Sequence, residues 1–521
     1  MSVSLRTAAM RESTAAARPD ALTAVIAGFT LLRLVLAAAT PLLPQEAYYW
    51  VWSRHLAASY FDHPPLMSWS IALTTALFGS TALGIKSAAV LWGLGWNLLW
   101  ARLVIDLFGD RRLAWRTLLA LNLTVLYQVH ALGAAPDAPL IFGWVGTIWA
   151  VWRACRRDQT RWWLLAGAMA GLALLGKYSA VLLGPVVLGF LLMSPAHRVQ
   201  LRRPGPWLAA AVAALLFTPV LLWNAQHGWV SFAFQSTRRI GQMAGLRPQH
   251  LLGLAATQAL LVTPFLFALA LAAFGRGLRD ALARRPDERR LLLWVSAAVP
   301  LLLFGTVALR APVRINWLAP AWWSLIVLAA ARLPADTPLP RGWRIGLASS
   351  AVMLLLVLVV FTVPNLPLPH NLNSWSAWHE TAQQVAREQQ ALQARGERSF
   401  VFGPNYKVAS LLRFHLPGKP RTYAQDIYGA PALQYDYLPP AGDLRGATGI
   451  LVLADQDQAQ LDLTRLAPYC ASVEPAQQLQ TGAFGRSARR TEIWLCRGYR
   501  GHPRVHATNP APPRDDAAQA D

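Results

Sequence analysis

The sequence predicts a polytopic α-helical membrane protein that ends in a soluble α/β domain. Of its 521 residues, 55% are hydrophobic and 14% are charged, whereas a soluble protein of this length usually has about a quarter charged residues. Between residues 21 and 363, about 11 apolar segments follow one another, each close to the length that a helix needs to cross a bilayer. Beyond residue 363 the composition changes to that of a soluble domain.

The excess of positive charge belongs to the apolar part of the chain. The formal net charge is +22, but residues 1–363 contain 32 Lys and Arg against 12 Asp and Glu, whereas residues 364–521 contain 16 against 14. The basic residues form short clusters between apolar segments and do not gather on a polar domain. We therefore expect them to set the membrane topology, and we expect no nucleic acid as a partner.

The apolar segments predict the transmembrane domain, residues 21–363. We expect spans at 21–40, 82–107, 113–130, 139–154, 161–176, 178–194, 207–224, 251–274, 291–309, 317–332 and 345–363. The segment 66–79 is short and follows two prolines, so we expect a helix that lies at the membrane interface or enters the membrane partly. It belongs to a first outer loop over residues 41–81. The first span is long and lacks a convincing cleavage site, so we expect no cleavable signal peptide.

The loops between these spans predict the orientation. When the loops are alternated, 22 basic residues fall on one side of the membrane and 8 on the other. Because basic loops favour the cytoplasm, the N-terminal tail, residues 1–20, is expected to be cytoplasmic. Eleven spans then place the C-terminal domain on the outer side.

The α/β domain is predicted over residues 364–505. Its pattern indicates a helix, a short strand at 399–402, a Gly-Pro-Asn turn and a second helix, followed by a buried strand in "TGILVLA" and a last strand in "RTEIWLCRGY". Cys470 and Cys496 either form a disulfide, if the compartment is oxidising, or remain two separate thiols. Residues 506–521 are expected to be disordered. No Cys or His spacing typical of a metal site occurs; no cofactor is predicted, although a divalent metal stays open.

Three acids of the membrane domain fall on the outer side, namely Glu46, Asp62 and Asp137. Acids beside an apolar helix bundle are costly unless they are paired, hydrated or used in function. The alternative is a local role, because Asp62 and Asp137 precede prolines as turn or cap residues do, and Glu46 near a helix start also favours the helix dipole. We predict that these acids belong to an active site.

Cations and aromatic residues also fall on the outer side. Lys177 and Arg314 either reach lipid headgroups or neutralise an anionic substrate. The loop that carries Glu46 is rich in aromatic residues such as Tyr48 and Tyr49. Aromatic rings stack on sugars and carboxylates bind hydroxyls, so a saccharide site is chemically reasonable. Arg33, inside the first span, requires a partner that the sequence does not identify.

The motifs of residues 21–363 resemble a known superfamily. "PQEAYYWVWSRHL", "SYFDHPPL", "APDAPLIF", "GKYSAVLL", "LLWNAQHGWVSF" and "VRINWLAPAW" are similar to motifs of the bacterial branch of the dolichyl-phosphate-mannose protein mannosyltransferases, which is related to lipid A aminoarabinose transferase. The C-terminal domain matches more weakly. The resemblance implies a type C membrane glycosyltransferase fold with its active site in the first outer loop.

The resemblance also implies the chemistry. The donor would be a polyprenyl phosphate sugar, such as one on undecaprenyl phosphate, used without a nucleotide and with inversion. The acceptor would be lipid A, a glycan, another lipid or a protein of the bacterial envelope. The reaction would take place on the periplasmic face of the inner membrane, so that membrane lipids are also partners.

The site residues that the resemblance implies carry some departures from the family pattern. Relatives usually have Asp-Glu where this chain has Gln45-Glu46, so Glu46 or Asp137 would be the base or the acid that orients the acceptor. Asp62 would organise the donor sugar or the loop. Aminoarabinose transferases have Glu-Lys-Pro-Pro where this chain has Asp62-His63-Pro64-Pro65, and Arg where it has Tyr48. His63, with Lys177 and Arg314, would therefore lie around the donor phosphate, beside the substrate-binding Tyr48 and Tyr49. A phosphate acceptor would need no base.

Two other classes of protein remain possible from the residues. A secondary transporter or flippase for a lipid-linked or anionic substrate would also have many spans and outer ions. Against it, no broken-helix pair or inverted repeat is evident, and the acids gather at one face. A structural scaffold would keep its cellular phenotype when Glu46 and Asp137 are neutralised.

Overall fold

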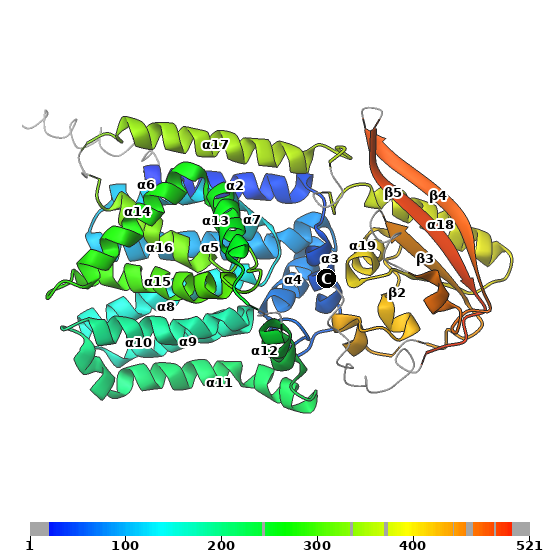
Figure 1. Cartoon of the computed structure of the whole chain (residues 1–521), viewed down its shortest axis with the longest axis horizontal. Coiled ribbons are helices and arrows are strands. Elements are labelled where there is room, and N and C mark those ends of the chain that lie inside the picture. The colour runs from blue at the N-terminus through cyan, green and yellow to red at the C-terminus, as the bar shows by residue number, and fades with distance from the viewer. Residues whose placement is uncertain are drawn as a thin grey trace, which may run out of the picture.

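The computed structural model describes residues 20–241, 245–333, 337–368, 373–440, 442–454, 462–483 and 486–502. Most of the predicted N-terminal tail and the predicted disordered tail at 506–521 lie outside these residues. The described chain forms a bundle of roughly parallel helices, with a smaller domain that contains a β-sheet at one end of the bundle (Figure 1).

All eleven predicted spans are helical. Six helices are long and apolar enough to cross a membrane, or seven if a bent pair is counted as one span, among the described residues. The six are α2 (Ala21–Ala39), α5 (Ala82–Phe108), α8 (Asp137–Arg157), α11 (Pro204–Gln226), α15 (Glu288–Ala308) and α17 (Arg341–Thr362). The remaining bundle helices are α6 (Arg111–Asn122), α7 (Val125–Leu132), α9 (Thr160–Gly176), α10 (Leu183–Met193), α12 (Val230–Gly241), α13 (Pro248–Val262), α14 (Pro264–Ala281) and α16 (Ala319–Ala330).

The expectation of no broken-helix pair was wrong. The predicted span 251–274 consists of α13 and α14, whose axes differ by 115°. Pro264 lacks an N–H and restricts the residue before it, which disfavours a continuous helix. Thr263 adopts a positive φ of 73° at the break, and its hydroxyl shares a hydrogen bond of 2.7 Å with Ser350 of α17.

The segment predicted as a span at 113–130 is also divided, and the division explains Arg33. The chain turns between α6 and α7, where Asn122 and Gln128 direct their side chains to Arg33 of α2. Arg33 Nε donates to Gln128 Oε1 at 3.0 Å, and Nη2 donates to Asn122 Oδ1. Asn122 in turn donates to Asn97 of α5 at 2.8 Å. Buried polar groups require such partners, so this network joins four helices.

The first loop contains two short helices at the end of the bundle. Helix α3 (Pro44–Ser53) is almost entirely buried, and α4 (Leu66–Phe78) packs against α3 and α5. Pro44 is the first residue of α3, a position where proline favours the start of a helix. The non-helical segment that follows α3 ends at Pro64–Pro65, directly before α4.

The smaller domain has a mixed five-stranded sheet in the order β2-β1-β3-β5-β4. Its elements are α18 (Trp378–Ala394), β1 (Ser399–Phe402), α19 (Tyr406–His415), β2 (Thr422–Tyr423), β3 (Thr448–Ala454), β4 (Ser472–Ala483) and β5 (Arg486–Arg497). Strand β1 pairs in parallel with β2 and β3, whereas β5 runs antiparallel to β3 and β4. The strand predictions at β1, β3 and β5 are confirmed.

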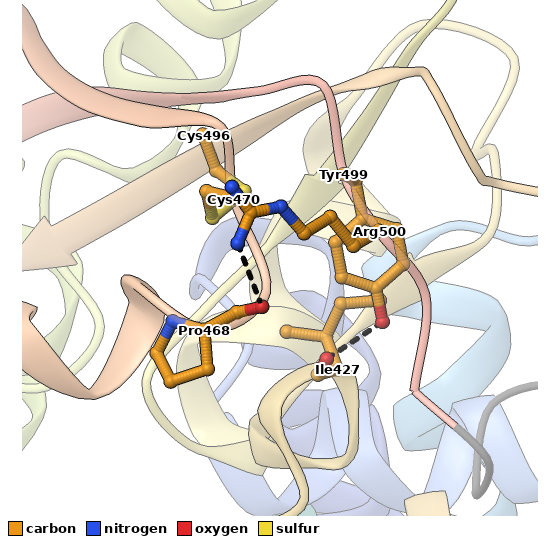
Figure 2. The surroundings of a disulfide bond; sticks show 6 residues. All are labelled: Ile427, Pro468, Cys470, Cys496, Tyr499 and Arg500. Carbon is orange, nitrogen blue, oxygen red and sulfur yellow. Dashed lines mark hydrogen bonds between the residues drawn. A yellow bond between two sulfur atoms is a disulfide. The ribbon is translucent and has the colours of Figure 1, made fainter.

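A disulfide connects the segment before β4 to strand β5 (Figure 2). Cys470, just before β4, is bonded to Cys496 of β5, which decides between the two alternatives left open above. Nearby, the Tyr499 hydroxyl donates to the Ile427 carbonyl at 2.7 Å and Arg500 Nη1 donates to the Pro468 carbonyl at 3.4 Å. The disulfide and these hydrogen bonds fasten the end of β5 to its surroundings.

The smaller domain packs directly on the first loop. Helix α19 lies against α3, and the rings of Tyr406 and Tyr48 are 4.4 Å apart between centroids. The Gln434 backbone N–H donates to the Tyr48 hydroxyl at 2.9 Å, and the Phe61 backbone N–H donates to Gln434 Oε1 at 2.7 Å. The loop therefore lies between the helix bundle and the smaller domain.

Candidate active site

A cavity of about 520 Å³ lies where the bundle, the first loop and the smaller domain meet. Three predicted substrate-binding residues, His63, Lys177 and Arg314, line it. Among the described residues, the lining consists of Gln45, His63, Lys177, Tyr178, Ser179, Val181, Leu182, Gln235, Leu303, Phe304, Arg314, Asn316, Trp317, Tyr406 and Lys407. The predicted phosphate-binding residues are thus brought together, although they come from distant parts of the chain.

Asp137 holds Lys177 in place through an ion pair. It is the first residue of α8, and Lys177 follows the last residue of α9. Lys177 Nζ donates to Asp137 Oδ1 at 2.8 Å, Asn316 Nδ2 donates to Oδ2 at 2.9 Å, and His130 Nε2 lies 3.6 Å from Oδ1. Both members of the ion pair are buried. Both oxygens of the Asp137 carboxylate are engaged by these partners, so this geometry favours a positioning role over the role of a base.

Glu46 occupies a different position from the one we predicted for a base. Its carboxylate accepts hydrogen bonds from Lys86 Nζ at 2.6 Å, from the Leu43 backbone N–H at 2.8 Å and from the Ala134 backbone N–H at 3.0 Å. Glu46 is 2% exposed and does not line the cavity. These contacts join the start of α3 to α5 and to the α7–α8 turn, so Glu46 is placed as a structural residue.

The Glu46–Lys86 pair gives the first testable prediction. Glu46→Gln and Lys86→Met should each lower the free energy of unfolding by about 3–5 kcal/mol, because each leaves a buried charge without its partner. The double variant should recover most of that loss and retain the turnover number of the folded protein. Chemical unfolding of the purified variants measures the first effect. Full stability of Glu46→Gln together with lost activity would contradict this assignment.

Asp62 has the surroundings of an acid that titrates near neutral pH. It lies in the first loop after α3 and is half-buried. Its Oδ1 accepts from the Tyr48 hydroxyl at 3.2 Å, and its backbone carbonyl accepts from Gln235 Nε2 at 2.8 Å. Burial raises the pKa of the Asp62 carboxyl to about 7, since a low-dielectric environment disfavours the charged form.

Tyr48 and Tyr49 support this acid and do not line the cavity. Both are buried, and burial together with the charge of Asp62 raises the pKa of each phenol well above its usual value, so both hydroxyls stay protonated. The Tyr49 ring lies 6.1 Å from the His63 ring, edge to face. The two tyrosines therefore fix the Asp62–His63 segment at the rim of the cavity.

The smaller domain contributes Tyr406 and Lys407 to the cavity, which our sequence analysis missed. Asn405 caps α19 by accepting from the Lys407 and Val408 backbone N–H groups at 3.0 and 3.1 Å. This cap places Lys407 in the first turn of α19. The "GPN" turn before a helix is a signal for a cap, but the sequence does not indicate that this turn faces the membrane domain.

No group of three or more His, Cys, Asp or Glu that could hold a metal ion occurs within the described ranges. The cavity itself offers cations and hydrogen-bonding side chains, with Asp62 beside it.

Known proteins resemble the chain in sequence and in fold. A family model described as dolichyl-phosphate-mannose-protein mannosyltransferase matches residues 62–223. The lipid A galacturonosyltransferase RgtD of Rhizobium johnstonii is 28% identical over 420 residues, which cover 79% of this chain and 86% of that protein. The crystal structures of ArnT from Cupriavidus metallidurans, in the apo state and bound to undecaprenyl phosphate, are 17% and 18% identical. Each has a TM-score of 0.57 and covers 90% of this chain and 97% of the other.

Proposed function

We propose that this chain, which belongs to the superfamily of membrane glycosyltransferases that includes the dolichyl-phosphate-mannose protein mannosyltransferases, moves a sugar from a polyprenyl phosphate donor to lipid A. The observation that carries the proposal is the cavity. It combines cations from the bundle and the smaller domain with an acid of pKa about 7 beside it. The name of RgtD supports lipid A as the acceptor, and ArnT bound to undecaprenyl phosphate supports the donor class.

The cations of the cavity would bind the donor phosphate. Lys177 is held in place by Asp137, whereas Arg314 and Lys407 reach the cavity from the α15–α16 connection and from α19. During transfer, an acceptor oxygen attacks the anomeric carbon, the bond from that carbon to the phosphate oxygen breaks, and the polyprenyl phosphate leaves with the electron pair. Positive groups that are already in place stabilise the charge that develops on this leaving group.

Asp62 would be the base, in place of Glu46 or Asp137. Glu46 and Asp137 are each occupied by a lysine and by further hydrogen bonds. Asp62 does not line the cavity either, but it is adjacent to His63, which does, and its carboxylate accepts from the Tyr48 hydroxyl rather than from a lysine. A base works best when its pKa is near the working pH. We therefore infer that the acceptor group is a hydroxyl, whose proton passes to Asp62, because a phosphate acceptor needs no base.

The reaction would take place on the periplasmic face of the inner membrane. The smaller domain and the first loop lie at the same end of the bundle (Figure 1), and disulfides such as Cys470–Cys496 persist mainly in oxidising compartments. The basic loops expected on the opposite side favour the cytoplasm. A cytoplasmic N-terminus and a periplasmic C-terminal domain agree with both observations.

A transfer assay tests the proposal. Purified protein would be incubated with lipid A and a panel of labelled undecaprenyl phosphate sugars that includes galacturonic acid, aminoarabinose and mannose. We expect one sugar to be added to lipid A, as measured by mass spectrometry. The alternative is a flippase, a function that the α13–α14 break favours. In sealed vesicles a flippase would move the donor across the bilayer and leave the mass of the donor unchanged. Movement without transfer would overturn the proposal.

A further inference from the structure

A group of three arginines and a histidine lies where the first loop meets the smaller domain. It consists of Arg54 and His55 at the end of α3, Arg413 of α19, and Arg421 just before β2. Burial and the charges of the three arginines lower the pKa of the His55 imidazole to about 4. His55 is therefore neutral at pH 7, and its Nε2 lies 3.4 Å from both Nη1 and Nη2 of Arg413.

These arginines have unsatisfied hydrogen-bonding capacity. The Nε atoms of Arg413 and Arg421 are buried and have no hydrogen-bond partner, and Arg413 is 8% exposed. Among the described residues none of the three arginines forms an ion pair with an acid. Asp426 interacts electrostatically with Arg421, but burial and Asp436 raise the pKa of Asp426 to about 7, so that at neutral pH it is only partly ionised and does not balance the charge of three arginines. A buried guanidinium without a counter-ion is costly.

This cluster is separate from the cavity. Gln45 of α3 lines the cavity, whereas Trp50 lies about 140° further round the helix, because each residue advances an α-helix by about 100°. Arg413 Cζ lies 5.9 Å and Lys419 Nζ 5.4 Å from the centre of a Trp50 ring. The cluster therefore adjoins the side of α3 that faces away from the cavity.

We propose that Arg54, His55, Arg413 and Arg421 form a second anion site, which binds the phosphate group of a membrane lipid. The planar guanidinium matches the geometry of phosphate oxygens, and a phosphate would supply the acceptors that the buried Nε atoms lack. Arg54 is exposed, and His55 and Arg421 are partly exposed, so a headgroup has access. The phosphate could come from a bilayer phospholipid or from a phosphorylated glycolipid. Neither source requires the transfer reaction proposed above.

Native mass spectrometry of the full chain in detergent tests the site. The probes are phosphatidylglycerol, lipid A, lipid A stripped of its phosphates, and diacylglycerol. The test variant is Arg54→Ala/Arg421→Gln, which leaves the buried Arg413 in place. The matched control is Arg445→Ala/Arg465→Ala, which removes two exposed arginines of the smaller domain. Thermal unfolding of each variant confirms that it is folded.

We expect the test variant to bind at least one phosphate-bearing probe about tenfold or more weakly than the wild type, since it loses charge-assisted hydrogen bonds to the phosphate. The control variant should bind as the wild type does. A loss confined to phosphatidylglycerol identifies a bilayer lipid as the source, and a loss confined to intact lipid A identifies a glycolipid. Unchanged binding of phosphatidylglycerol and of intact lipid A would overturn the inference. An equal loss for the probes that lack phosphate, diacylglycerol and the stripped lipid A, would overturn it as well.

Discussion

Replacing Asp62 with asparagine should lower the turnover number for sugar transfer by about 10²–10⁴-fold, the usual contribution of a general base. Asparagine keeps the size of the side chain and can still accept from the Tyr48 hydroxyl, which donates to Asp62 Oδ1 at 3.2 Å. It cannot take a proton from the acceptor hydroxyl. Steady-state transfer to lipid A with saturating donor measures the effect.

The pH dependence of the wild type follows from the same carboxyl. Asp62 works as a base only when it is deprotonated, and its pKa is raised to about 7. The rate should therefore rise as the pH increases through about 7 and level off above it, and this acid limb should be absent in Asp62→Asn. An acid limb that persists near pH 7 in the variant would assign the titration to another group.

Asp426→Asn is the matched control. Burial and Asp436 raise the pKa of the Asp426 carboxyl to about 7 as well, but its Oδ1 accepts from the Ala424 backbone N–H inside the smaller domain, and Asp426 does not line the cavity. We expect wild-type turnover and an unchanged pH profile. Wild-type turnover in Asp62→Asn would show that Asp62 is not the base.

The helix bundle was largely predictable because its signal is local. Each span is a run of apolar residues, and such runs identify helices without knowledge of their neighbours. The break at Thr263–Pro264 also had a local signal, the proline. The prediction relied on hydrophobicity alone and therefore treated α13 and α14 as one span. Strand β4 was missed because its "SVEPAQQLQTGA" segment is largely polar and none of its residues is fully buried. It is a strand because it pairs along β5.

The sequence was sufficient to identify several residues of the candidate site, but it was not sufficient to assign their roles. The predicted topology placed Glu46, Asp62 and Asp137 on the same side of the membrane domain. Which of them has a lysine partner depends on contacts between helices, because Lys86 and Lys177 are each 40 positions away from the acid that they contact. The same dependence concealed Lys407, which reaches the cavity because the smaller domain packs on the first loop.

Two buried lysine–carboxylate pairs with different surroundings now permit a direct comparison. Glu46–Lys86 is removed from the lining of the cavity, whereas Lys177 of the Asp137–Lys177 pair forms part of it. The Coulombic and desolvation contributions to stability should be similar in the two pairs. Lys177 can also stabilise the charge that develops on the leaving phosphate, whereas Lys86, which does not line the cavity, cannot. Paired substitutions can therefore separate stability from catalysis.

Lys177→Met should lower the free energy of unfolding by about 3–5 kcal/mol, because it leaves Asp137 buried without its ammonium partner. It should also lower the turnover number by about 10²–10³-fold, as the loss of one preorganised group at a developing charge does. Adding Asp137→Asn should restore most of the stability and none of the turnover, whereas Glu46→Gln/Lys86→Met should be stable and active. Chemical unfolding and transfer to lipid A, measured on these three variants and on the wild type, decide the outcome. A Lys177→Met/Asp137→Asn protein with near wild-type turnover would mean that Lys177 only neutralises Asp137, and the donor phosphate would then have to be held by Arg314 and Lys407.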